Sequence, residues 1–135
     1  VLAGAAQAEG GPGDCIVGDV TEAHELSSLA LAAQVKAPVA LVVIDNGGGR
    51  IFEQLPIASR DLPDGAFDLF TTPPRVRFDL AAEAYGVRYA AAEDAESARA
   101  AVRESLARPG VTLVHVKVAP SAASALEARL REALR

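Results

Sequence analysis

The chain has 135 residues, of which 50% are hydrophobic and 23% are charged. These values exclude a disordered chain and predict one domain with its own core. The formal net charge of −5, with acids and bases interspersed, argues against a nucleic-acid surface and against a polybasic membrane anchor. The longest apolar stretch, Val39 to Ile44, is too short to span a bilayer. We therefore expect a cytoplasmic protein without a nucleic-acid or membrane partner.

The first half of the chain predicts a βαβ unit. An opening helical pattern, which begins at Val1 as if the chain were a piece of a longer polypeptide, stops at Gly10–Gly13. Cys15–Val17 then predicts a short buried strand, in which the cysteine is a packed thiol rather than a nucleophile. Apolar positions three and four apart predict a helix over 22–34 with Thr21 as its N-cap. The β-branched run Val39–Ile44 predicts a strand covered on both faces.

The second half alternates helices and strands after a long connection. A short helix is expected over 50–55, and the proline-rich stretch 56–77 predicts a long loop that acts as a lid or binding segment, unless it is a disordered insert. The later elements are a helix over 78–85 that stops at Gly86, a strand over 87–90, a helix over 94–107, a strand over 111–118 and a helix from 121 to the end. This order predicts a single α/β domain over 1–135, a three-layer open parallel sheet with helices on both faces.

Polar residues follow the first two predicted strands. Asp19 comes after the first strand, and Asp45 and Asn46 come after the second. Since the carboxyl ends of parallel strands meet at one edge, we expect these side chains to face one another. Oxygen ligands of this kind suit Mg²⁺, and the Gly48 carbonyl is able to turn inward as a third ligand. A diphosphate would lie at the N-terminus of the helix after Thr21.

The spacing of these residues resembles the diphosphate-binding motif of thiamine diphosphate enzymes, which opens Gly-Asp-Gly and closes Asn-Asn. Val20 replaces the last glycine and Asp45 replaces the first asparagine, whereas Asp19 and Asn46 keep the metal-binding positions. The menaquinone-pathway branch of that superfamily, the MenD family of 2-succinyl-5-enolpyruvyl-6-hydroxy-3-cyclohexene-1-carboxylate synthases, places a larger apolar residue at the position of Val20. The chain also resembles this branch in Gly18–Thr21, His24–Leu31, Gln34–Pro38, Asn46–Phe52 and Leu55–Pro56.

The resemblance implies a C-terminal diphosphate-binding domain of a longer, homo-oligomeric transferase that uses thiamine diphosphate with Mg²⁺ or Mn²⁺. Such an enzyme decarboxylates 2-oxoglutarate and adds the resulting carbanion to isochorismate. The catalytic glutamate belongs to a pyrimidine-binding domain absent from this sequence, so the isolated chain should be inactive. The implied cofactor-binding residues are Gly18, Asp19, Val20, Thr21, Asn46, Gly48 and Ile51, the implied metal ligands are Asp19, Asn46 and Gly48, and the implied substrate wall is Ile51, Phe52 and Leu55.

Several residues also have simpler interpretations. Ile51 and Leu55 fit the core face of a short helix, and His24 fits a surface position. Arg50 is placed to approach a substrate carboxylate but fits a solvated side chain equally well. His115 alternates within a strand, so packing is its default role. The rival functions are another thiamine diphosphate enzyme, of the acetolactate synthase or 2-oxo-acid decarboxylase type, and a stand-alone binding module without catalysis.

Overall fold

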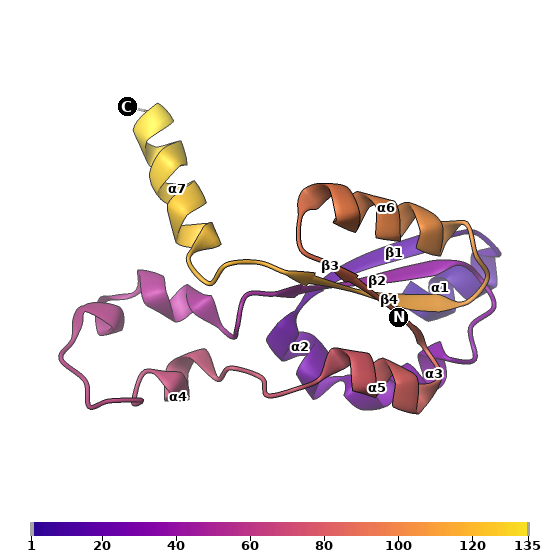
Figure 1. The fold of residues 1–135 in the computed structure, drawn as a ribbon, viewed down its shortest axis with the longest axis horizontal. Helices are drawn as coiled ribbons and strands as arrows, with labels where there is room; N and C mark the ends of the chain where they lie inside the picture. The colour runs from indigo at the N-terminus through magenta and orange to yellow at the C-terminus, as the bar shows by residue number, and fades with distance from the viewer. Residues whose placement is uncertain (1, 135) are drawn as a thin grey trace.

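The computed structural model describes residues 2–134, which form a four-stranded parallel sheet in the order β1-β2-β4-β3 (Figure 1). The strands are β1 (Gly13–Gly18), β2 (Val39–Asp45), β3 (Arg88–Ala92) and β4 (Val111–Lys117). All neighbouring pairs are parallel, so the carboxyl ends of β1 and β2 lie at the same edge. The predicted convergence of the first two strand ends is therefore confirmed.

Helices cover both faces of this sheet, which confirms the predicted three-layer α/β architecture (Figure 1). On one face lies α6 (Ala95–Leu106), which packs on β2, β3 and β4. The helices on the other face are α1 (Leu2–Glu9), α2 (Asp19–His24), α3 (Leu29–Ala32) and α5 (Phe78–Tyr85). The last helix, α7 (Ala122–Ala133), projects away from the sheet, and none of its residues is buried (Figure 1). Val1 and Arg135, the ends of two predicted helices, lie outside the described residues.

The core lies on both sides of the two central strands. Val43 and Leu113 are fully buried on the side of α3 and α5, and Ala40 and Val114 are fully buried on the side of α6. The prediction that the Val39–Ile44 run is covered on both faces is confirmed. β1 differs, because its residues alternate between half-buried and exposed and Ile16 is 68% exposed. The prediction of a fully buried first strand is therefore wrong, since β1 is an edge strand.

The helix predicted over 22–34 is wrong in its bounds and continuity. Its first part, α2, begins at Asp19 with Gly18 as N-cap, so Thr21 is inside the helix. A 3₁₀ turn at Leu26–Ser28 then separates α2 from α3, which ends at Ala32. Leu26 and Leu29 both pack into the core, and a 3₁₀ turn aligns residues three apart. Burial of these two leucines therefore outweighs the continuous helical pattern.

The segment between β2 and α5 is more regular than predicted. The short helix predicted over 50–55 is a 3₁₀ helix at Arg50–Gln54. The stretch 56–77, predicted as a long loop, contains a 3₁₀ helix at Pro56–Ser59 and the short helix α4 (Asp68–Thr71), so the prediction of a structureless connection is wrong there. Thr71 fixes the point at which this segment comes back to the turn after β2. The residue is 2% exposed, and its carbonyl oxygen accepts a 2.6 Å hydrogen bond from the Gly49 amide. The following helix α5 ends at Gly86 in the left-handed conformation, as the sequence predicts.

Gly48 makes this return possible. Its φ is +116°, and a Cβ atom there would lie 2.3 Å from the Thr71 carbonyl oxygen. Only a residue without a side chain lets the two backbone segments approach this closely. The glycine run after β2 thus ties the far end of the 50–71 segment to the sheet edge.

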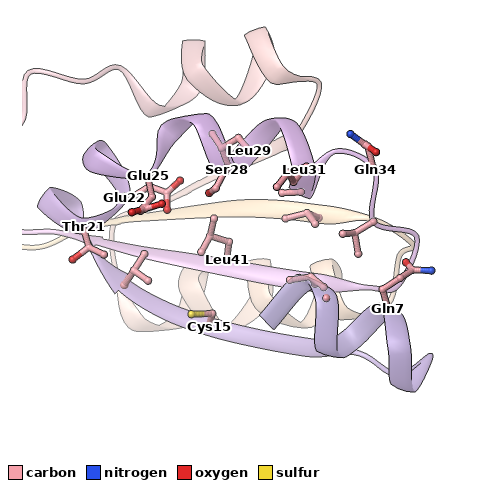
Figure 2. A pocket seen from close by; sticks show the side chains of 16 residues that line it. Gln7, Cys15, Thr21, Glu22, Glu25, Ser28, Leu29, Leu31, Gln34 and Leu41 are labelled. Carbon is pink, nitrogen blue, oxygen red and sulfur yellow. The ribbon is translucent and has the colours of Figure 1, made fainter. Parts of the chain in front are cut away.

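The core is open between α1, β1 and the α2–α3 stretch, where a pocket of about 640 Å³ remains (Figure 2). Apolar side chains such as Leu29 and Leu41 line most of it, together with the polar residues Thr21, Glu22 and Glu25. Glu22 is 3% exposed, and its Oε1 atom has no hydrogen-bond partner among the described residues. Burial, and secondarily the charge of Glu25, raises the pKa of Glu22 from 4.5 to about 7.

Described helices include none that is both long enough and apolar enough to cross a membrane. The longest are α6 and α7, with 12 residues each. A bilayer span needs about 20 apolar residues.

Glu22 makes the free energy of unfolding depend on pH. Because its pKa is higher in the folded state, stability falls as pH rises from about 4.5 to about 7 and then levels off. Glu22→Gln stays neutral, so its advantage over the wild type should grow by about 2 kcal/mol between pH 5.5 and 8.5. Urea unfolding at the two pH values measures this, with Glu83→Gln on the exposed face of α5 as control. An advantage independent of pH would contradict the assignment.

Gly48→Ala tests the contact that returns the 50–71 segment. The matched control is Gly65→Ala, because Gly65 also has a positive φ, of +75°, but has open space around it. The control should lose about 1–2 kcal/mol of stability for its backbone conformation. Gly48→Ala should lose about 1–3 kcal/mol more because of the clash, and proteolysis within 56–71 should accelerate. Equal losses in the two variants would show that the tight approach is unimportant.

Candidate metal and diphosphate site

Two strand ends meet at Asp19. Asp19 follows β1 directly and opens α2, and the residue is 2% exposed. Oδ2 accepts a 2.7 Å hydrogen bond from the Gly48 amide, and Oδ1 accepts one of 2.9 Å from the Val20 amide. The structure therefore brings Asp19 and Gly48 together, as the sequence predicts, although 29 residues separate them.

The predicted ligands Asn46 and Gly48 lie on the turn that follows β2. Asn46 is half-buried, and its side chain has no hydrogen-bond partner within residues 2–134. The Gly48 carbonyl oxygen accepts a 2.9 Å bond from the Arg50 amide, which leaves its second lone pair for another partner. Arg50 also bonds the Asn46 carbonyl oxygen at 3.1 Å and Glu53 at 2.5 Å. Arg50 therefore braces the turn, and the interpretation of a solvated side chain is wrong.

Asp45, the residue that departs from the Asn-Asn pattern, belongs to a partly buried chain of polar side chains. Its Oδ2 lies 2.8 Å from Nε2 of His115, and Nδ1 of His115 lies 2.9 Å from the Tyr89 hydroxyl. Burial raises the pKa of Asp45, but hydrogen bonds from His115 and from the Gly47 amide lower it, and the net pKa is below its usual value. His115 is 6% exposed, which confirms the predicted packing.

Sequence reasoning missed the partnership between Asp45 and His115. The two residues are 70 positions apart, and pairing of β2 with β4 places Val43 rather than Asp45 directly beside His115. The only sequence signal for this contact is that His115 lies on a predicted strand and Asp45 lies at the end of another predicted strand. His24, in contrast, is exposed, as the sequence predicts for a surface residue.

The donor atoms at this edge suit a hard divalent cation. Asp19 offers carboxylate oxygen, Asn46 an amide oxygen and Gly48 a carbonyl oxygen, which are the ligand types of Mg²⁺. Residues 2–134 contain no group of three His, Cys, Asp or Glu side chains arranged to hold a metal. A cation here would need ligands from outside the chain, as Mg²⁺ has when it binds together with phosphate oxygens.

The predicted apolar wall lies on the 3₁₀ helix Arg50–Gln54 and just after it. Ile51 is 66% exposed and Leu55 is 46% exposed, so their interpretation as the core face of a short helix is wrong. Phe52 is half-buried and packs on Phe70, with ring centroids 6.0 Å apart. The wall is therefore presented outwards, next to the turn that carries Asn46 and Gly48.

The proposed diphosphate residues occupy the start of α2. Gly18 and Thr21 are exposed and Val20 is half-buried. Thr21 also lines the pocket beside Glu22, but Asp19, Asn46 and Gly48 do not (Figure 2). That pocket and the cluster of oxygen ligands are therefore separate features that share the first turns after β1.

Comparison with known proteins identifies the family. Residues 2–116 match the model of the C-terminal TPP-binding domain of thiamine pyrophosphate enzymes. The chain is 35% identical over 132 residues to a 2-succinyl-5-enolpyruvyl-6-hydroxy-3-cyclohexene-1-carboxylate synthase of Shewanella amazonensis, with 98% of this chain and 23% of that protein covered. A synthase of the same name from Sorangium cellulosum is 39% identical, with 95% and 21% covered. The predicted resemblance to the MenD family is confirmed.

Solved structures of decarboxylases are also similar to this chain. The thiamine diphosphate-dependent 4-hydroxybenzoylformate decarboxylase of Rhodococcus jostii is 28% identical, has a TM-score of 0.63 and is matched over 78% of this chain and 19% of its own. The benzoylformate decarboxylase of Polynucleobacter necessarius, at 20% identity and a TM-score of 0.66 over 81% and 20%, shares the fold. The chain spans about a fifth of the length of these relatives. It belongs to the family of C-terminal thiamine-pyrophosphate-binding domains of thiamine pyrophosphate enzymes.

Proposed function

We propose that this chain is the diphosphate- and metal-binding domain of a 2-succinyl-5-enolpyruvyl-6-hydroxy-3-cyclohexene-1-carboxylate synthase. The observation that supports it most is the buried hydrogen bond between Asp19 and the Gly48 amide, which joins the two halves of the diphosphate motif. Relatives with that name are 32–39% identical to this chain, whereas the 4-hydroxybenzoylformate decarboxylase is 28% identical. The higher identity supports the synthase branch over the decarboxylases.

The metal ligands in this proposal are Asp19, Asn46 and the Gly48 carbonyl, and Mg²⁺ or Mn²⁺ is the ion. Asp19 supplies the charge, whereas the other two supply neutral oxygens. The start of α2, from Gly18 to Thr21, lies against the diphosphate in this proposal with the positive end of the helix, and the Val20 amide stays bonded to Asp19. The domain's own task is therefore to anchor and orient the cofactor.

Thiamine diphosphate, when bound, supplies the electron sink for decarboxylating 2-oxoglutarate and adding the product to isochorismate. Ile51, Phe52 and Leu55 form the apolar side of the substrate site in this proposal. The exposure of Ile51 and Leu55 supports it, because an apolar wall in a binding site needs to be free of its own core. The domain that supplies the acid-base glutamate is a different part of the enzyme, so residues 1–135 alone should show no turnover.

Assembly and location complete the proposal. Leu126 and Leu130 on α7 are 55% and 54% exposed, and Leu69 near the start of α4 is 80% exposed. Such apolar surface supports contact with the other domains of the enzyme and with a second subunit in a homo-oligomer. We place this oligomer in the cytoplasm.

Asp19→Asn tests the metal assignment. Asparagine keeps an oxygen that accepts the hydrogen bond from the Gly48 amide, but it lacks the negative charge that Asp19 would place beside the metal ion. In the polypeptide that carries this chain, Mg²⁺-dependent affinity for thiamine diphosphate should fall by more than about 100-fold, beyond the loss typical of residues that only support a ligand. Isothermal titration calorimetry measures this.

The matched control is Asp14→Asn, since Asp14 lies on β1 but is exposed and makes no contact with the turn after β2. It should bind the cofactor like the wild type. Wild-type affinity in Asp19→Asn would contradict the metal assignment.

A further inference from the structure

His115 connects three elements of the fold through its imidazole ring. The ring lies on β4, at 6% exposure, and Phe78 of α5 packs edge-on against it with centroids 5.1 Å apart. Its two nitrogens contact Asp45, the last residue of β2, and Tyr89 of β3, at 2.8 and 2.9 Å. A ring held by both nitrogens and by packing has one orientation.

The direction of these hydrogen bonds follows from their chemistry. A carboxylate only accepts, so Nε2 carries the proton and donates it to Asp45. In the neutral ring, Nδ1 then accepts from the Tyr89 hydroxyl. Tyr89 therefore fixes the tautomer that His115 needs to hold Asp45.

Asp45, held by His115, also bonds to the turn that carries the proposed ligands. Its Oδ1 accepts a 3.1 Å bond from the Gly47 amide, and its carbonyl oxygen accepts one of 2.9 Å from the Val118 amide. The next amide, of Gly48, bonds to Asp19. The turn is thus fixed from two sides, by Asp19 through Gly48 and by Asp45 through Gly47.

We propose that His115 is a positioning residue, which acts through Asp45 to hold the Gly47–Gly48 turn in the shape that presents Asn46 and the Gly48 carbonyl. Without His115, one oxygen of a half-buried carboxylate loses its partner and the Asp45 side chain is free to rotate away from Gly47. That the turn serves metal binding rests on the proposed function. The ordering of the turn by His115 does not.

Two substitutions separate the hydrogen bond from packing. His115→Met fills a similar volume without a donor, whereas His115→Gln keeps an N–H at about the position of Nε2. Leu113→Val is the control, because Leu113 is fully buried on the same strand, two residues away, and contacts the core rather than Asp45. All three variants are made in the polypeptide that carries this chain.

The first readout is hydrogen–deuterium exchange of the peptide spanning 45–49, measured by mass spectrometry without metal. Exchange in His115→Met should be about tenfold faster than in the wild type, the effect of losing one hydrogen bond to a charged group. His115→Gln should restore most of the protection. Exchange in His115→Met no faster than in Leu113→Val would overturn the proposal.

The second readout is the affinity for Mn²⁺ with thiamine diphosphate present, followed by the electron paramagnetic resonance of free Mn²⁺. His115→Met should weaken it by about 10- to 100-fold, as loss of a residue that supports a ligand does, and His115→Gln by much less. Unchanged affinity in His115→Met would overturn the proposal. A wild-type protein without Mn²⁺ affinity would instead defeat the proposed function, and the exchange experiment would still decide the role of His115.

Discussion

The hydrogen bond from the Gly48 amide to the Asp19 carboxylate is the constraint on which the site depends. It is buried and 2.7 Å long, and it joins the end of β1 to the turn after β2. The parallel sheet makes it possible, because both strands end at one edge. The turn after β2 also fixes the 50–71 segment. Gly48 has no side chain to obstruct the Thr71 carbonyl, and the Gly49 amide donates a hydrogen bond to that carbonyl oxygen. One carboxylate thus organises the proposed metal ligands and the proposed apolar wall beside them.

The same domain leaves other surfaces unsatisfied. Ile51 and Leu55 are exposed beside the proposed ligands. Helix α7 has no buried residue (Figure 1), and Glu22, which lines the pocket next to α1 (Figure 2), has an Oε1 atom without a hydrogen-bond partner within residues 2–134. Exposed apolar residues and a buried acid without a partner both cost stability in an isolated domain. They are consistent with a chain that spans about a fifth of its relatives' length and works with other domains, as we propose.

Local patterns predicted what depends on short stretches of sequence. The β-branched run of β2, the end of α5 at Gly86 and the meeting of Asp19 with Gly48 all follow from periodicity, glycine and strand order. Contacts between distant parts of the chain were not predictable in this way. Burial of Leu26 and Leu29 broke the helix after Asp19, and the bond between Asp45 and His115 joined residues 70 positions apart. Asp45 looked like a departure from the family motif, whereas the structure gives it a partner of complementary chemistry.

The proposed metal site consists of three oxygen ligands from two strand ends. A crystal structure of the polypeptide that carries this chain, grown with Mn²⁺ and thiamine diphosphate, tests it most directly, because anomalous scattering locates the metal independently of the protein atoms. We predict one peak bonded to a carboxylate oxygen of Asp19, the amide oxygen of Asn46 and the carbonyl oxygen of Gly48, with Asp45 still bonded to His115. A cofactor bound with its metal on other residues, or with no metal beside Asp19, would contradict this assignment.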